Sequence, residues 1–535
     1  MGLQRKLKCA RAASRGEAPI HLKPLADKAT RSVFIIEYLL LGGAKIAGPN
    51  YHNWIANWLG LGVYEEDQLL RFVQQLCPTG NRCGKRFAEA LRWAEQRVEA
   101  GWWVATWQDQ NRFPKECPKV LFGRGRLDSD VRWLAVLNSR KPKLTSPDAQ
   151  WLAALRQALA DHAPGAATGI ASSFGTTTYD LLTALARQGD RPLCLILPFP
   201  LEQLTTNEAL ASLLTGKKPD LALTCQSAIL RCSRAARQFC RDQLLVHFAD
   251  DNLALEIRTG GNLHTILQER QTNRPGGLIV FRPTARDPGN AGNFSLMESF
   301  PTAETFELKK PPKAPPTGEG AAAPGLFCQW LPTREYWDRY LYHYTRACPG
   351  PWPGQSYREY LLALWENEPL CEHTALETLV RMLREKRVRA SNRITRGAQP
   401  VISWSARPPS EIAAMRRWNP ALIRWTFEPY GIAISKKVLL TIGAKPAIYA
   451  AEEFYSRLDG KDRFRYQRHA PPACAWKQER EWRSPGDLAL DERCRRHGFI
   501  FVNTHADAEY VARSAEMDMP IMVLSALRST PGPLP

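Results

Sequence analysis

The sequence predicts an α/β protein in three parts: an N-terminal helical cap, a Rossmann-type parallel sheet, and a separate α+β C-terminal domain. At 535 residues the chain is too long for a single hydrophobic core. Between residues 134 and 198, short apolar runs alternate with segments of helical spacing, which is typical of strand–helix–strand units. Residues 284–325 are rich in proline and glycine and predict an extended linker, so two folded halves are expected.

The first strand–helix unit begins with an apolar run at residues 134–137, which is long enough for a buried strand and too short for a helix. The apolar residues of segment 151–159 recur at helical spacing. Between the two lies Asn-Ser-Arg at residues 138–140, a polar turn that offers a hydroxyl and a forked guanidinium. This combination suits the binding of a phosphate group.

A second unit repeats this order. Gly169 opens a loop rich in Ser, Thr and Gly, a helix is expected over residues 179–186, and a strand is expected over residues 192–198. Polar loops at the carboxyl ends of parallel strands, each leading into a helix N-terminus, form a place for an anion. The same pattern also occurs in a purely structural parallel sheet, so both interpretations stay open at this point.

The rest of the chain divides by composition. The N-terminal residues are basic and poor in large apolar groups, and the segment after them has helical apolar spacing. The last third mixes helical and strand patterns. The expected parts are a basic flexible arm at residues 1–31, a helical domain at 32–110, the Rossmann-type domain at 111–283, the linker at 284–325 and the α+β domain at 326–535.

Charge and composition favour a nucleic-acid partner. The chain has 72 Lys and Arg against 53 Asp and Glu, a formal net charge of +19. An excess of this size favours polyanions through counterion release, although a solvated basic surface would give the same count. The 17 Trp residues include enough aromatic surface for stacking on unpaired bases.

Other patterns point to a cytoplasmic protein without a cofactor. The 13 cysteines include no CxxC pair and no Cys/His run at zinc spacing, so reduced thiols and no metal site are expected. The best membrane candidate, the apolar stretch from Ser32, contains Glu37 and is too short to span a bilayer. No Walker, GxSxG or HExxH motif is present.

The order of motifs between residues 96 and 282 resembles the DNA-processing protein A (DprA) family, a Rossmann-like family that binds single-stranded DNA. The family's phosphate turn corresponds to residues 138–140, and its glycine-rich second loop corresponds to residues 169–178. A P-x-x-L-x-x-R-G approach precedes the first strand, and an Arg-Asn-Arg helix start and a Ser-Gly-Ser-Leu-x-Thr loop follow it. These three motifs are matched by Pro118, Leu121, Arg124 and Gly125, by Arg241-Asp242-Gln243, and by residues 260–265.

This resemblance implies a phosphate-binding surface. The chain departs from the family pattern by losing charge, since Asn138 replaces a glycine and Gln243 an arginine, and Ser172 and Gly175 stand where the family has Arg and Asp. A free nucleotide in place of DNA is therefore an alternative ligand. The residues expected to bind nucleic acid or phosphate are Ser139, Arg140, Lys141, Gly169, Ser172, Ser173, Thr176, Arg241, Gly261 and Asn262.

Residues 370–483 resemble the AbiGi-like abortive-infection family of phage-defence proteins, which look distantly like ADP-ribosyltransferases. The resemblance rests on the strand Val401–Ser405, the turn Gly443–Pro446 and the segment Glu479–Arg483. If this half transfers ADP-ribose, His373 and Glu481 are its candidate catalytic residues, although a helix cap and an ion pair are the ordinary roles for such residues.

Two functional hypotheses follow. The first is a DprA-like protein that binds single- or double-stranded DNA in bacterial anti-phage defence, as the antitoxin or sensor that restrains a toxin. The resemblance implies a phosphoribosyltransferase-like toxin as its partner, and a homodimer is a further option for its assembly. The second hypothesis is an ADP-ribosyltransferase-like or NAD-consuming effector whose Rossmann-type domain senses a nucleotide. In the first case no enzymatic activity is expected.

Overall fold

A computed structural model describes residues 22–40, 83–107, 120–309 and 327–525, with short gaps inside the last two ranges, and four isolated positions between residues 55 and 71. The chain forms two compact units. Unit 1 comprises residues 1–310 together with residues 355–367, and unit 2 comprises residues 311–354 and 368–535.

Unit 1 is built on one mixed sheet in the order β1-β2-β3-β7-β6-β5-β4-β8-β9-β10. The strands from β4 to β10 run parallel, and β1, β2 and β3 extend one edge in antiparallel pairing. The strands are β1 (Leu22–Pro24), β2 (Trp102–Trp107), β3 (Val120–Gly125), β4 (Arg132–Leu137), β5 (Thr168–Ser173), β6 (Leu193–Ile196), β7 (Leu221–Thr224), β8 (Asp251–Ala254), β9 (Leu278–Phe281) and β10 (Glu304–Phe306).

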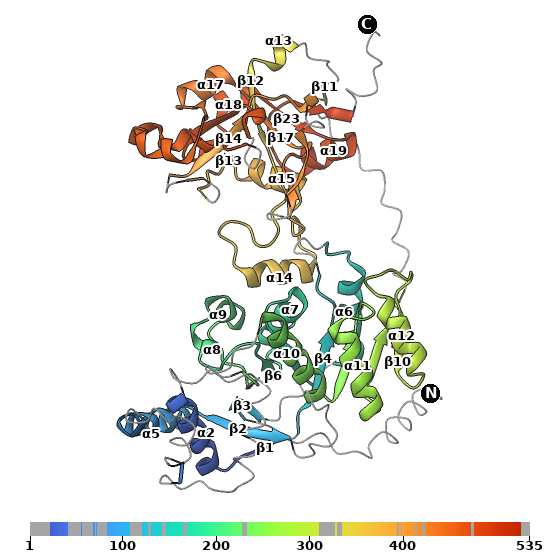
Figure 1. Cartoon of the computed structure of the whole chain (residues 1–535). Helices are drawn as coiled ribbons and strands as arrows, with labels where there is room; N and C mark the ends of the chain where they lie inside the picture. The colour runs from blue at the N-terminus through green and yellow to red at the C-terminus, as the bar shows by residue number, and fades with distance from the viewer. Residues whose placement is uncertain are drawn as a thin grey trace. The chain divides into compact units, whose positions relative to one another are not determined.

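Helices follow most of the parallel strands and pack along the sheet (Figure 1). The central strands are buried along almost their whole length, as expected for a parallel sheet covered on both faces. The helices are α2 (Asp27–Leu40), α5 (Cys83–Glu99), α6 (Gln150–His162), α7 (Thr177–Gln188), α8 (Gln203–Thr206), α9 (Glu208–Leu214), α10 (Arg234–Phe248), α11 (Asn262–Asn273), α12 (Ala291–Ser299) and α14 (Tyr357–Glu366).

The expected α/β class and the first strand–helix units are confirmed, but three boundaries differ. Residues 102–107 form a sheet strand within the segment expected to be only helical, because their alternate side chains pack against the sheet's helices. Residues 284–309, expected as linker, contain α12 and β10, since Asn290 and Asn293 satisfy the backbone of this proline- and glycine-rich turn. Helix α14 belongs to unit 1, where it packs on α7 and α9.

Unit 2 is the separate strand-rich domain that the sequence predicts. Its main sheet has the order β11-β24-β23-β17-β12-β14-β21-β18 and is mostly antiparallel. The strands of this sheet are β11 (Phe327–Cys328), β12 (Tyr340–Tyr344), β14 (Val401–Ser405), β17 (Gly431–Ser435), β18 (Lys445–Pro446), β21 (Glu481–Pro485), β23 (Gly498–Val502) and β24 (Ile521–Val523).

Shorter elements surround this sheet. Three strand pairs are β13 (Arg387–Val388) with β22 (Leu488–Ala489), β15 (Trp418–Asn419) with β16 (Arg424–Trp425), and β19 (Ile448–Ala450) with β20 (Tyr466–Arg468). The helices are α13 (Arg334–Trp337), α15 (Ala375–Arg384), α17 (Lys436–Thr441), α18 (Glu492–Arg496) and α19 (His505–Ser514), with 3-10 turns η2 (Pro409–Glu411), η3 (Glu452–Arg457), η4 (Gly460–Arg465) and η5 (Trp476–Glu479).

Two searches for particular features gave negative results. Among the described residues, no helix is long and apolar enough to cross a membrane. The same part of the chain holds no group of three or more His, Cys, Asp or Glu side chains that could bind a metal ion. Residues 1–21 of the expected basic arm, most of residues 41–82, and Pro118 lie outside the described residues.

Candidate functional site

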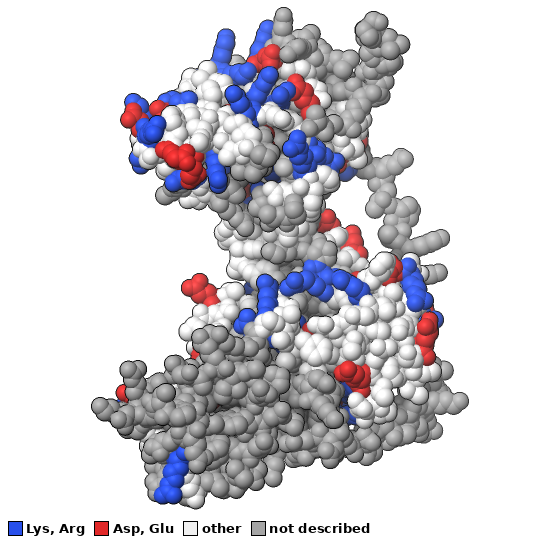
Figure 2. All heavy atoms as spheres, viewed as in Figure 1, with Lys and Arg blue, Asp and Glu red and all other residues white. Residues whose placement is uncertain are grey.

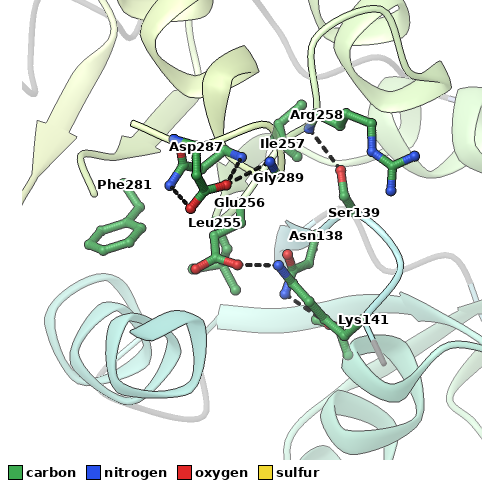
Figure 3. Close-up of polar contacts among 12 residues, drawn as sticks. Asn138, Ser139, Lys141, Leu255, Glu256, Ile257, Arg258, Phe281, Asp287 and Gly289 are labelled. Atoms are coloured by element: carbon green, nitrogen blue, oxygen red, sulfur yellow. Dashed lines mark hydrogen bonds and ion pairs between the residues drawn. The ribbon is translucent and has the colours of Figure 1, made fainter. Parts of the chain in front are cut away.

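The parallel sheet of unit 1 changes direction at its centre. From β4 the chain proceeds through β5, β6 and β7 on one side and later through β8, β9 and β10 on the other. The loops that follow β4 and β8 therefore diverge, and the crevice between such loops is where open α/β sheets usually bind their ligands. We call residues 138–141 and 255–261 the switch-point edge (Figure 3).

Ser139 ties the two loops of the switch-point edge together. Its backbone N–H donates to the carbonyl of Glu256 at 2.9 Å, and its hydroxyl accepts from the backbone N–H of Arg258 at 2.9 Å (Figure 3). The predicted serine therefore lies at the edge, but its hydroxyl is already used within the protein. Its role there is to hold the second loop next to the first.

Lys141 lies on the first loop and forms an ion pair with Glu256 on the second, and both side chains are largely buried. The pair adds a second link across the crevice, and it neutralises the charge that was expected to contact a phosphate. A buried pair of this kind is weak evidence for stability, but breaking it by removing one partner leaves an uncompensated charge.

Two exposed arginines remain at this edge. Arg140 and Arg258 are exposed, and neither forms an ion pair or a side-chain hydrogen bond with the described residues. Nearby, Arg286 reaches Glu298 only at 3.9 Å, and both of these side chains are more than half exposed. In Figure 2, Lys and Arg side chains form a row along one border of unit 1. Solvated guanidinium groups in this arrangement favour an extended polyanion.

The N-terminus of α11 opens onto the same edge. Its N-cap is Gly261, which offers no side chain for the first backbone amides, and Gly260 before it has a positive φ of +70°. Asn262, the first helical residue, is exposed. Uncapped amides and the helix dipole make such a terminus favourable for a negative charge, so the predicted residues Gly261 and Asn262 are placed to contact one.

The N-terminus of α7, the second expected anion site, is occupied by the protein itself. The hydroxyl of Thr176 accepts from the N–H of Tyr179 at 3.4 Å, and the N–H of Gly175 donates to Asp180 at 2.9 Å. The hydroxyl of Tyr357 on α14 donates to the other oxygen of Asp180 at 3.2 Å. Burial raises the pKa of Asp180 to about 7 in spite of these bonds. A further anion would meet a carboxyl group here.

Four other predicted residues serve the fold. Gly169 lies at the start of β5 and not in a loop, because the backbone approaches Trp133 and Val131 too closely there for a side chain. The hydroxyls of Ser172 and Ser173 are buried and donate to the carbonyls of Tyr179 and Ile196, at 2.9 and 2.5 Å. The predicted loop thus begins only after residue 173.

Arg241 is the fourth of these residues. It was expected at a helix start, but Ser233 caps α10 and the helix begins at Arg234, so Arg241 lies inside the helix. Its buried guanidinium donates to Asp242 at 2.7 Å and lies over the ring of Tyr179. It is therefore committed to the core of unit 1.

The sequence reasoning missed two residues of the site. Arg258 is one, and its signal was present, because a strand, an arginine and a glycine pair precede α11 in the same order as the first loop. Asn293 is the other: its amide oxygen accepts from the N–H of Ile257 at 2.7 Å, and its amide nitrogen donates to the carbonyls of Phe281 and Leu255. It holds the ends of β8 and β9 in place, and no local pattern predicts this.

Asn138 has one open bonding position. Its amide nitrogen donates to the hydroxyl of Thr178 at 3.1 Å, while its buried amide oxygen has no hydrogen-bond partner among the described residues. The residue that replaces the family's glycine therefore bridges β4 to α7 and restricts the space at the first turn.

The two candidate catalytic residues of unit 2 do not share a site. His373 is buried with its Nδ1 at 2.6 Å from the carbonyl of Gly350, its ring against Trp352, and its pKa lowered to about 4 by burial. Glu481 lines a cavity that His373 does not reach, and it is paired with Arg483 at 2.9 Å. The pair proposed for ADP-ribosyl transfer is thus not assembled.

No family model and no curated protein matches this chain. Among solved structures, it is similar to DNA processing protein A (DprA) from Streptococcus pneumoniae, with 11% identity and a TM-score of 0.34 over 53% of this chain and 95% of that one. It is also similar to DNA processing protein A from Helicobacter pylori, described for its single-stranded DNA binding mode, with 16% identity and a TM-score of 0.28 over 38% and 90% of the two chains. What this chain binds is therefore inferred from its own residues.

Proposed function

We propose that unit 1 binds DNA, single strands in preference to duplex, at the switch-point edge. The observation that carries this proposal is the placement of Arg140 and Arg258, two exposed guanidinium groups on loops that Ser139 joins, beside the uncapped N-terminus of α11. Such groups can each take one phosphate of a flexible strand. Single-stranded DNA is the ligand that the order of motifs implies, and the excess positive charge agrees with a polyanion.

The mechanism is binding, without a chemical step. The arginines and the first amides of α11 would contact successive phosphates, which positions the strand but reads no sequence. Because phosphate contacts release counterions, the affinity should fall steeply with salt, with a slope of about −0.7 per contact for a single strand. Weak sequence preference and strong salt dependence are the expected signature.

The test is fluorescence anisotropy with the full chain, a labelled single strand and a matching duplex at several salt concentrations. Tighter binding of the single strand with a steep salt slope is the expected result. Binding of a free mononucleotide at this edge, with no salt-dependent binding of either DNA, would favour the nucleotide alternative and overturn the proposal.

A finer role is in bacterial anti-phage defence, acting in the cytoplasm as the antitoxin or sensor that restrains a phosphoribosyltransferase-like toxin. Its support is the resemblance of residues 370–483 to AbiGi-like proteins. The expected result is a lower plaquing efficiency of phage on cells that carry the complete locus than on cells in which this chain is inactivated. Equal plaquing across a broad phage panel would contradict the role, and light scattering of the purified chain would test the homodimer.

A further inference from the structure

Unit 2 contains a cavity of about 310 Å³ that the DNA-binding proposal does not use. Its wall is formed by β12, β14, β21 and the β15–β16 hairpin. Two glutamates face it, Glu479 at the end of η5 and Glu481 at the start of β21. They stand two residues apart, but their surroundings differ.

Glu481 is fully engaged by the protein. It accepts a hydrogen bond from the hydroxyl of Ser403 at 2.8 Å and forms an ion pair with Arg483 at 2.9 Å. The guanidinium of Arg483 is itself buried and donates further to the carbonyls of Phe464 and Tyr466. Glu481 therefore holds the cavity wall together.

Glu479 has no such partner. Its carboxyl group forms no hydrogen bond or ion pair with the described residues, although its side chain lines the cavity. Burial raises its pKa to about 7, with Glu481 nearby adding to the rise and Arg346 and Arg417 opposing it. A buried carboxyl group without a partner is costly, and a ligand that donates hydrogen bonds to it removes that cost.

The same cavity has aromatic walls. Tyr344, Trp425 and Phe427 line it, and the rings of Tyr344 and Phe427 meet edge to face with their centroids 5.1 Å apart. Rigid flat surfaces of this kind suit a planar ring in the ligand. A ring system attached to a hydroxylated group that can donate to Glu479 fits these walls better than an aliphatic ligand does.

A second cavity of about 250 Å³ adjoins the first and shares His343, Tyr344, Arg346 and Arg424 with it. This second cavity is strongly cationic, because five arginines line it against one glutamate, Glu385. That glutamate is shared by Arg381 and Arg389, each at 2.7 Å. One carboxylate cannot neutralise the whole group, so this end of the space favours the oxygens of phosphate groups.

We propose that the two cavities of unit 2 form one binding site for a nucleoside polyphosphate. The base lies among the aromatic rings of the first cavity, the ribose hydroxyls donate to Glu479, and the phosphates lie among the arginines of the second cavity. The site is independent of the switch-point edge, since all of its residues belong to unit 2.

The test is isothermal titration calorimetry on the full chain with ADP, AMP, adenosine and pyrophosphate as probes. ADP should bind about tenfold more tightly than AMP or adenosine, since it alone occupies both cavities with base, ribose and two phosphates. Two variants then separate the ends of the site. Glu479→Gln should weaken ADP and adenosine alike by about fivefold or more, whereas Arg389→Gln should weaken ADP and leave adenosine unchanged.

Controls make each outcome decisive. Glu509→Gln, an exposed glutamate on α19, should change nothing. Glu479→Ala removes the acceptor oxygens altogether, and the melting curve of each variant shows whether unit 2 has kept its fold. No heat with ADP would overturn the proposal. Binding of ADP that survives both unit 2 substitutions in folded protein but is lost in Arg140→Ala would place the nucleotide in unit 1 and would also overturn it.

Discussion

At the switch-point edge of unit 1, Arg140 and Arg258 stand in solvent, whereas in unit 2 arginines and glutamates line two adjoining cavities. Both regions are cationic, but the first offers an open surface and the second an enclosed volume. An open surface can follow a long, flexible polyanion through many weak contacts, and an enclosed one selects a small ligand by shape. Similar charge therefore supports two different ligands in one chain.

A second contrast lies within unit 1. The helices α7 and α11 both begin at the carboxyl ends of parallel strands, but α7 is capped by Thr176 and faces Asp180, while α11 begins at Gly261 without a side-chain cap. The helix dipole alone would make the two sites equivalent. The polar groups already bonded at α7 decide which terminus stays open to a ligand.

The largest expected effect concerns the brace beneath the edge. Asn293→Ala removes a fully buried amide and leaves the N–H of Ile257 and the carbonyls of Leu255 and Phe281 without their partner. We expect the free energy of unfolding of unit 1 to fall by about 2 to 4 kcal/mol. Hydrogen exchange on peptides of both units measures this, and equal loss of protection in unit 2 would contradict the assignment of the brace to unit 1.

The next effect tests the occupied terminus of α7. The pKa of Asp180 is raised to about 7 by burial, so the folded state binds a proton that the unfolded state releases near pH 4. Stability of unit 1 should therefore decrease as the pH rises from about 4 to 7, and Asp180→Asn should remove this decrease. At pH 8 the variant should be more stable by about 1 to 3 kcal/mol, because one pKa unit corresponds to about 1.4 kcal/mol. Urea unfolding at pH 5 and pH 8 measures both values; a variant less stable than the natural chain at pH 8 would contradict the account.

The smallest effects compare the two caps directly. Thr176→Ala should destabilise unit 1 by about 1 kcal/mol, and Gly261→Ser, whose backbone conformation suits a capping serine, should stabilise it by a few tenths of a kcal/mol. The new hydroxyl would also take up an amide of α11, so single-stranded DNA should bind about two- to fivefold more weakly. Anisotropy and urea unfolding on the same samples test this, and unchanged DNA affinity would show that α11 does not contact the strand.

The sequence was informative where local physics decides the outcome. The apolar run at residues 134–137 became β4, and the expected helix at residues 179–186 lies within α7, since hydrophobic spacing largely determines such elements. The sequence was misleading where distant residues decide. Gly169 was placed in a loop because its composition resembles one, although its strand is fixed by packing against Trp133.

The same limit applies to the site. The pairing of Lys141 with Glu256 joins residues 115 positions apart, and the pairing of Arg241 with Asp242 depends on burial against Tyr179. Neither is visible in a local motif, so a basic residue in a phosphate-like turn was expected to be available when it is not. Arg140 was predicted, and its exposure agrees with the role expected of it.

The most direct measurement is the salt dependence of single-stranded DNA binding by the full chain, by Arg140→Ala, and by Arg140→Ala with Arg258→Ala. Arg126→Ala, an exposed arginine beyond the end of β3 that pairs with the start of β7 and so lies at the opposite edge of the sheet, is the matched control. Each substitution at the switch-point edge should cost about 1 to 2 kcal/mol and lower the salt slope by about 0.7. Equal affinities and slopes for the double variant and the control would contradict the claim that this edge binds DNA.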